Sequence, residues 1–296
     1  MIASLDWQHD GADWPNRESS RFVDVAGIRW HVQSMGHGPV ALLVHGTGSS
    51  THSWRALAPL LAEHFTVVAL DLPGHAFTAA PSFERLSLPG MAQALAALLS
   101  SERLECAVAV GHSAGAAILA RMCLDGDIAP RVLISLNGAL LPLGGLAGQI
   151  FAPLANLVVR IPAVPWMFAR MAGSTAATER LIAETGSVID PAGIEFYRRL
   201  VGNADHAAAV AAMMANWDLR DLARELPRLK PPPVLVVGSN DRTIAPADAY
   251  RVKSLLPSAT VIRLSRLGHL AHEERPLDVA RIVFDAARIA GILADS

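Results

Sequence analysis

The sequence predicts an α/β fold: a mostly parallel sheet of about eight strands, flanked by helices, with an inserted helical cap. Two observations support this. Short apolar strands alternate with helices before residue 138 and again after residue 230, a pattern typical of parallel sheets with right-handed crossovers. Between them, residues 139–229 contain helical patches and no convincing strand. We therefore expect a core of residues 1–138 and 230–296 and a cap of residues 139–229.

The core begins with a predicted hairpin. Residues 21–34 alternate between apolar and polar side chains around Ala26-Gly27, which predicts two antiparallel strands at one sheet edge. Short apolar runs follow, as expected for strands covered on both faces; they span 40–44, 66–70, 107–110 and 132–136. The intervening helices are predicted at 53–64, 88–99 and 113–124.

The rest of the chain contains the cap and the end of the core. Helical patches of the cap lie at 176–184, 194–201 and 206–217. After Lys230-Pro231-Pro232-Pro233 the alternation resumes, with strands predicted at 234–237 and 260–264 and helices at 246–256 and 276–293.

The composition limits the classes of function. Of 296 residues, 52% are hydrophobic and 18% charged, and a charged share below the usual quarter leaves room for a large core or a large apolar site. The net charge of −2 gives no electrostatic reason to expect nucleic acid. Residues 1–20 are charged and lack the apolar run of a signal peptide. We expect a cytoplasmic protein in which Cys106 and Cys123 are small core side chains.

One uncharged stretch allows two interpretations. Residues 139–168 contain a single charge, Arg160, and several prolines that disfavour a spanning helix. Short apolar helices of this kind can be buried cap core, or they can rest on a bilayer surface. We hypothesise a weak peripheral contact with the inner membrane, and buried cap core remains the alternative.

A strand–turn–helix pattern surrounds the predicted nucleophile. Gly111-His112-Ser113-Ala114-Gly115 follows one apolar run and precedes a helix-forming run. In this context Gly-x-Ser-x-Gly forms a nucleophile elbow, which holds a strained serine with its hydroxyl above the sheet. The flanking glycines permit close backbone contacts, and the helix N-terminus favours developing negative charge. Ser113 is therefore the predicted nucleophile.

An acid and a histidine follow two later strands. Asp241 comes just after the strand at 234–237, and His269 after the strand at 260–264. Alone, each could be an ordinary turn or loop residue. Together with Ser113 they lie at strand carboxyl ends, in the chain order of a Ser-Asp-His triad. Such a histidine takes the serine proton, and the aspartate holds the imidazole in one tautomer.

Further residues are predicted around this triad. The backbone N–H groups of Ala114 and Thr47 are the expected oxyanion donors. The residues expected to contact substrate are Gly46, His112, Asn137, Met213 and Trp217. Met213 and Trp217 could equally be cap core, and Asn137 could simply close a turn. No His-Glu-x-x-His motif and no Gly-x-Gly-x-x-Gly after a strand is present, so we expect no metal and no cofactor.

These motifs resemble the α/β-hydrolase superfamily. The resemblance rests on His45-Gly46-Thr47-Gly48, Asp71-Leu72-Pro73-Gly74-His75, Gly111-His112-Ser113-Ala114-Gly115, Asp241 and Gly268-His269. It implies the α/β-hydrolase fold with an inserted cap over the active site. Serine at the elbow, in place of aspartate, argues against haloalkane dehalogenases and epoxide hydrolases. Ala76 departs from the glycine often found after the Asp-x-x-Gly turn, which affects a loop and not the triad.

A narrower resemblance covers both core and cap. The chain is similar to the α/β-hydrolase accessory proteins of magnesium chelatase, which belong to bacteriochlorophyll biosynthesis. The matching segments are 14–22, 30–33, 45–48, 51–54, 111–117, 136–140, 213–219 and 268–274. The resemblance implies a role in the porphyrin pathway, a tetrapyrrole as the apolar small-molecule ligand and a magnesium chelatase subunit as partner.

Two functional hypotheses follow. The first is a serine hydrolase that acts on an ester or related carbonyl of a large apolar molecule in this pathway. The alternative is a non-catalytic porphyrin-binding accessory or carrier protein for magnesium chelatase, in which the triad is a relict. Retention of every triad residue favours the first, because a carrier gives no reason to keep them.

Overall fold

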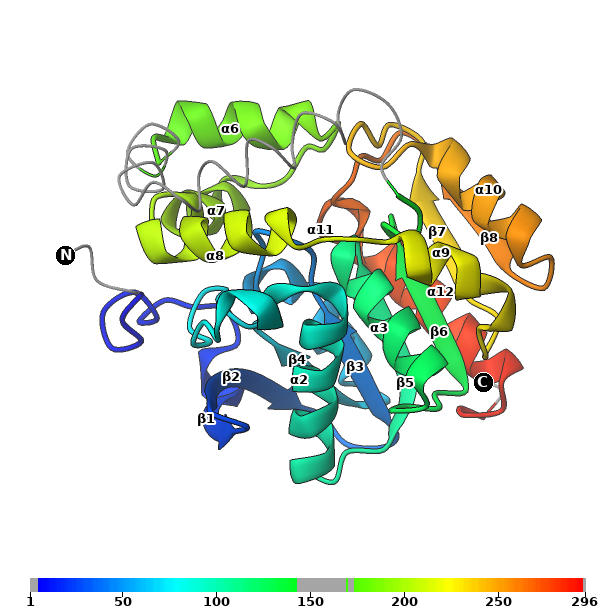
Figure 1. Ribbon diagram of the computed structural model, residues 1–296. Coiled ribbons are helices and arrows are strands. Elements are labelled where there is room, and N and C mark those ends of the chain that lie inside the picture. Colours follow the sequence, from blue (N-terminus) through cyan, green and yellow to red (C-terminus); the bar gives the residue numbers. More distant parts are fainter. Residues whose placement is uncertain (1–4, 143–168, 170–172, 295–296) are drawn as a thin grey trace.

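A single mixed sheet organises the computed structural model, which describes residues 5–142, 169 and 173–294 (Figure 1). Over these residues the sheet has eight strands in the order β1-β2-β4-β3-β5-β6-β7-β8. Their bounds are β1 Ser20–Val25, β2 Ile28–Met35, β3 Val40–Val44, β4 Thr66–Leu70, β5 Cys106–His112, β6 Val132–Leu136, β7 Val234–Gly238 and β8 Thr260–Leu264. β2 pairs antiparallel with β1 and β4, and the other neighbours are parallel. The predicted fold class is confirmed.

Alternating side chains of the central strands enter two cores. Leu42 and Val44 pack into one apolar cluster, whereas Ala41 and Leu43 of the same strand pack into the other. The helices on the first side include α2 Leu88–Ser101, α3 Ala114–Asp125 and α10 Pro246–Leu255. Those on the second side include α1 Leu57–Leu61 and α12 Pro276–Ile289. Burial on both faces explains why the strand sequences are apolar throughout.

The helix predicted at 53–64 is divided into two short elements. A 3-10 turn, η2 Thr51–Trp54, precedes α1, and the Ser50 side chain accepts a hydrogen bond from the backbone of His52 at its start. Pro59 has no N–H and cannot continue a helix from η2. Because α1 begins at Leu57, Pro59 falls in its first turn, where no N–H partner is required.

Helices follow β6 in the segment predicted as the cap. They are α6 Thr175–Glu184, α7 Pro191–Val201, α8 Ala204–Ala215 and α9 Arg220–Glu225, followed by the 3-10 turn η4 Leu226–Arg228. Ser174, Asp190 and Asn203 cap α6, α7 and α8 with their side chains. In Figure 1, α6, α7 and α8 lie beyond one end of the sheet. Within the described residues from β6 to β7 there is no strand.

The N-terminal segment joins this helical layer to the sheet. It contains the 3-10 turn η1 Arg17–Ser19. The Trp14 ring packs edge-on against Phe77 of the core and Phe196 of α7, and its Nε1–H donates to Thr51 Oγ1 at 3.0 Å. The exact core–cap division at residues 139–229 stays a prediction.

Only residues 139–142 of the uncharged stretch 139–168 belong to the described part of the chain. Residues 143–168 lie outside the described residues, so the membrane hypothesis is a prediction here. Among the helices that the structure describes, none combines the length and apolar character needed to cross a bilayer.

Candidate active site

The turn between β5 and α3 has the strained geometry of an elbow. Ser113 has φ 51° and ψ −117°, a conformation that L-residues rarely adopt. A side chain at Gly111 would lie 2.5 Å from the Ala116 Cα atom, and one at Gly115 would overlap the Val44 carbonyl. The Ser113 N–H donates to the Leu136 carbonyl at 3.0 Å, which fixes the turn beside β6. The two glycines therefore permit the close backbone contacts that this strained turn requires.

Asp241 and His269 meet at the carboxyl ends of β7 and β8. The Nδ1–H of His269 donates to Asp241 Oδ2 at 2.8 Å, and both side chains are buried. The other carboxylate oxygen accepts the N–H groups of Thr243 at 2.8 Å and Ile244 at 2.9 Å. With Nδ1 donating, the free lone pair lies on His269 Nε2, as a general base requires.

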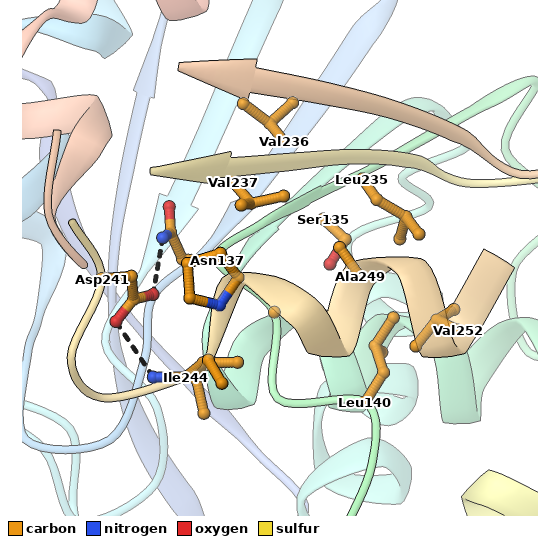
Figure 2. A pocket seen from close by; sticks show the side chains of 13 residues that line it. Ser135, Asn137, Leu140, Leu235, Val236, Val237, Asp241, Ile244, Ala249 and Val252 are labelled. Carbon is orange, nitrogen blue, oxygen red and sulfur yellow. Dashed lines mark hydrogen bonds between the residues drawn. The ribbon is translucent and has the colours of Figure 1, made fainter. Parts of the chain in front are cut away.

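Asn137 contributes a contact to the acid that the sequence did not reveal. It follows β6 with φ 47°, and its Nδ2–H donates to Asp241 Oδ2 at 2.6 Å (Figure 2). Its side chain thus points to the oxygen that also accepts the His269 proton. The predicted substrate contact of Asn137 remains a prediction. The only sequence signal for the observed role was a polar residue directly after a strand.

Figure 2 also shows a small pocket behind Asp241, between β6, β7 and α10. It has ≈20 Å³ of space, about enough for one water molecule. Leu140, Leu235 and Val252 give it mostly apolar walls. Ser113 is not among the residues that line this pocket.

His112 brings the elbow to the histidine loop. Its Nε2–H donates to the His269 carbonyl at 2.9 Å, and the two rings lie 4.7 Å apart. Among the described residues no hydrogen bond joins Ser113 Oγ to His269 Nε2. Catalytic hydrogen bonds often form fully only with substrate bound. The contact between His269 and Asp241 is thus present, and a triad with Ser113 stays a prediction.

The loop after β3 approaches the elbow closely. A side chain at Gly46 would lie 2.8 Å from Ser113 Cβ and 3.0 Å from His112 Nδ1. The Thr47 hydroxyl donates to Met213 Sδ at 3.7 Å, and the backbone N–H of Thr47 is the predicted oxyanion donor. Within the described residues, neither that N–H nor the N–H of Ala114 has a hydrogen-bond acceptor.

The two predicted cap contacts lie beside this loop. Met213 is fully buried within the core cluster, and Trp217 is half-buried against the same cluster. Both side chains therefore pack against the apolar cluster that includes residues of the sheet. Their role as an apolar substrate wall stays a prediction.

Buried neutral imidazoles surround His269. Burial, with additional repulsion from His272 and His269, holds the pKa of His112 well below its ordinary value. Burial likewise lowers the pKa of His272 to about 3. These rings stay uncharged near neutral pH, so they do not oppose a positive charge on His269. In the part of the chain that the structure describes, no three His, Cys, Asp or Glu side chains are arranged to hold a metal ion.

A second buried histidine–aspartate pair lies at the other side of the sheet. His31 Nδ1 is 2.7 Å from Asp71 Oδ2, and His31 Nε2 is 3.0 Å from Ser20 Oγ. Burial raises the pKa of Asp71, but His31 and the N–H of Thr51 outweigh it and lower this pKa to about 2. Ser20, His31 and Asp71 lie in sequence motifs that carry the family resemblance, and no sequence pattern predicts a contact between them.

Glu273 is a buried carboxyl that the sequence analysis also missed. It contacts the Arg55 guanidinium and accepts the Tyr197 hydroxyl at 2.8 Å. Burial raises the pKa of Glu273 to about 7 even though Arg55 opposes the shift. A glutamate four residues after a predicted catalytic histidine was the available signal.

Comparisons with known proteins agree with this fold. The model of the alpha/beta hydrolase family matches residues 41–282. The magnesium-chelatase 30 kDa subunit of Rhodobacter capsulatus is 36% identical over 279 residues, covering 93% of this chain and 96% of that protein. The 2-hydroxy-6-oxo-6-(2'-aminophenyl)hexa-2,4-dienoic acid hydrolase of Metapseudomonas resinovorans is 28% identical and covers 88% of each chain. An alpha/beta hydrolase fold protein from Burkholderia ambifaria superposes with TM-score 0.77 at 24% identity, over 96% of this chain and 100% of that one.

Proposed function

Because this chain belongs to the α/β-hydrolase family and is similar to a magnesium-chelatase subunit over nearly its whole length, we propose that it is a serine hydrolase of the porphyrin and bacteriochlorophyll pathway. Its substrate would be an ester or related carbonyl of a large apolar molecule, such as a tetrapyrrole. The observation that supports this most is the 2.8 Å contact of His269 with Asp241, built beside the strained Ser113 turn.

The proposed reaction uses these groups in two successive steps, acylation and deacylation of Ser113. The Ser113 hydroxyl attacks the carbonyl carbon while His269 Nε2 takes its proton. Asp241 keeps His269 in the required tautomer and stabilises the imidazolium. The leaving alcohol departs with the proton from His269, which produces an acyl-serine. Water then attacks the acyl group by the same route, and the acid and free serine are released.

Backbone donors would stabilise the negative charge of each tetrahedral intermediate. The N–H groups of Ala114 and Thr47 lie on the two loops that meet at Gly46. One such donor is typically worth about 10²–10³ in rate. The start of α3 adds a helix dipole with its positive end towards the same position.

The proposed substrate class follows from the surroundings of the site. Met213 and Trp217 would form an apolar wall, which suits a flat, largely hydrophobic ligand.

A weak contact of residues 139–168 with the inner membrane would admit such a ligand from the bilayer. Flotation of the protein with liposomes tests this contact: Leu146→Glu and Phe151→Glu should abolish flotation, and wild-type protein that stays at the bottom of the gradient would contradict it.

A carrier role is the second candidate. It is favoured by the name of the 36% identical relative, which describes a chelatase subunit and not a hydrolase. In that role the protein would bind a porphyrin and present it to magnesium chelatase without using Ser113.

One experiment separates the two functions. The wild type and Ser113→Ala are treated with a fluorophosphonate probe, and both are tested for support of a reconstituted magnesium chelatase. A hydrolase is labelled at Ser113, and the Ser113→Ala variant loses both labelling and function. A carrier supports the chelatase equally well with alanine at this position. Absence of labelling in the wild type would contradict the proposed hydrolase.

A further inference from the structure

One loop of the helical layer crosses both loops that carry the Asp241–His269 pair. The loop is Thr185–Val188, between α6 and α7. Its Thr185 carbonyl accepts the N–H of Arg242, the neighbour of Asp241, at 3.1 Å. The same carbonyl accepts the N–H of His269 at 3.4 Å. One peptide group therefore joins the acid loop to the histidine loop.

Two further hydrogen bonds hold the residues next to His269. The buried Ser187 hydroxyl accepts the N–H of Leu270 at 2.8 Å. The Glu274 carboxylate accepts the N–H of Gly268 at 2.8 Å and the N–H of Val188 at 3.3 Å. The backbone is thus tied to Thr185–Val188 on both sides of the histidine.

Packing at Gly186 leaves the loop no free space. Gly186 has φ +83°, and a Cβ atom there would overlap the Asn240 carbonyl directly before Asp241. The Gly186 backbone also lies so close to Gly268 that a Cβ on Gly268 would overlap it. A shift of the loop must therefore move the acid loop, the histidine loop or both.

The start of α7 is itself anchored to the core near the same histidine. Asp190, which caps α7, lies 2.8 Å from the Arg55 guanidinium. Tyr197 of α7 donates to Glu273 at 2.8 Å, and Arg55 also contacts Glu273. Glu273 belongs to the short helix α11 Ala271–Glu274, which begins two residues after His269.

We propose that Thr185–Val188 is the positioning element of the Asp241–His269 pair, with Gly186 and Ser187 as its positioning residues. The proposal rests on the proposed function for its catalytic consequence. The loop keeps His269 at the hydrogen-bond distance from Asp241, so the position of the helical layer sets the activity of the base. A displacement of about 1 Å at such a site can cost about 10²-fold in rate.

A matched pair of glycine variants tests the packing. Gly186→Ala forces a methyl group against the Asn240 carbonyl. Gly126→Ala introduces the same backbone strain at φ +82°, at the end of α3, where a Cβ atom meets nothing within 4 Å. We expect Gly186→Ala to slow fluorophosphonate labelling of Ser113 by about 10-fold or more, and Gly126→Ala to label at the wild-type rate.

A matched pair of serine variants tests the hydrogen bond. Ser187→Ala leaves the N–H of Leu270 without its acceptor. Ser174→Ala removes an exposed hydroxyl at the N-terminus of α6, which accepts the N–H of Ala177. We expect labelling to slow by about 3- to 10-fold in Ser187→Ala and to stay unchanged in Ser174→Ala. Circular dichroism and thermal melting establish that each variant is folded, and if Gly186→Ala fails to fold, Ser187→Ala decides.

A readout that needs no activity separates this inference from the proposed function. The His269 Nδ1 proton, bonded to Asp241, should give a low-field proton resonance that Asp241→Asn removes. Gly186→Ala and Ser187→Ala should shift or broaden this resonance, and the two controls should not. If the wild type is never labelled but the resonance responds as expected, positioning stands and the hydrolase function fails. Wild-type labelling rates and an unchanged resonance in both loop variants would overturn the proposal.

Discussion

The protein contains two sets of one serine, one histidine and one aspartate. They share a similar histidine–aspartate distance but differ in the backbone conformation of the serine and in the surroundings of the histidine. The elbow relay consists of Ser113, His269 and Asp241. The edge relay consists of Ser20, His31 and Asp71. Their histidine–aspartate distances are 2.8 and 2.7 Å. Among the described residues, only the edge relay also has a hydrogen bond between its serine and its histidine, with Ser20 Oγ 3.0 Å from His31 Nε2. Judged by these distances alone, the edge relay is the more complete triad.

The backbone separates the two relays. Ser113 occupies the left-handed region at φ 51°, at the start of α3, with helix N–H groups beside it. Ser20 has an ordinary extended backbone at φ −86°, at the start of the edge strand β1. An extended strand residue offers no cluster of unpaired N–H groups to a developing oxyanion. Strain and donors occur only at the elbow.

Access separates them as well. His31 is fully buried, with the rings of Trp7, Phe22 and Phe77 at 4.8 to 5.4 Å from its own ring. The Ser20 hydroxyl also accepts an N–H of Gln33 at 3.1 Å. A substrate carbonyl cannot reach an imidazole enclosed in this way, although Ser20 itself is only half-buried. The edge relay therefore connects the hairpin to β4, and the comparison shows that hydrogen-bonded distances alone do not define a catalytic site.

The largest expected effect comes from the two serines. Ser113→Ala should abolish probe labelling and reduce ester hydrolysis by about 10⁴–10⁶, because the elbow relay acts as a unit. Ser20→Ala should leave both unchanged. Labelling followed by peptide mass spectrometry, with p-nitrophenyl ester hydrolysis as the rate assay, measures this. Labelled Ser20, or near-wild-type hydrolysis by Ser113→Ala, would break the comparison.

The two aspartates should separate activity from stability. Asp241→Asn favours the wrong His269 tautomer, so hydrolysis should fall by about 10³–10⁴ while the protein stays folded. Asp71→Asn should keep its activity per folded molecule and lose stability, since Asp71 accepts the N–H groups of Thr51 and Phe77 as well as bonding His31. Rate assays and urea unfolding are carried out on the same samples. An Asp71→Asn variant that loses activity but not stability, or an Asp241→Asn variant that loses stability but not activity, would contradict the assignment.

The pH dependence gives the edge relay its own test. The pKa of Asp71 is lowered from its ordinary 3.8 to about 2 in the folded protein. A carboxyl whose pKa is lowered on folding stabilises the fold at pH values above its unfolded-state pKa, here by about 2 kcal/mol. The fold loses this contribution as the pH falls towards the folded-state pKa. The stability difference between wild type and Asp71→Asn should therefore shrink from pH 4 to pH 2. A difference independent of pH would contradict an ionised Asp71.

Local pattern explains what the sequence could predict. The strands at 66–70 and 132–136 are predicted to the residue, because mainly apolar runs end at turn residues there, and the more polar strand at 260–264 also has the predicted bounds. The order of parallel strands likewise places Asp241 beside His269. The Asn137 contact and the edge relay were not predictable, because each joins residues 11 to 104 positions apart without any repeating pattern. Only the folded sheet brings such residues together.

Asn137 should have an intermediate effect. Asn137→Gly tolerates the positive φ but removes the N–H that donates to Asp241 Oδ2. The carboxylate is then less well held and its charge less well balanced, so hydrolysis should fall by about tenfold, the cost of one hydrogen bond to a charged group. The loss should appear in kcat with KM unchanged. A change in KM alone would instead indicate the substrate contact predicted from the sequence.

The smallest expected effect concerns Thr47, whose hydroxyl is held by Met213 Sδ. Because the proposed oxyanion donor is the backbone N–H, Thr47→Val keeps the donor and the side-chain shape and should change kcat no more than about threefold. A fall of about 10²–10³ would identify the hydroxyl as the donor. Met213→Leu sharpens the test, since it frees the hydroxyl without altering the backbone. If Met213→Leu raises the rate and Thr47→Val then cancels the gain, the freed hydroxyl also donates to the oxyanion. If neither substitution changes kcat, Thr47 acts through its backbone N–H, beside the N–H proposed for Ala114.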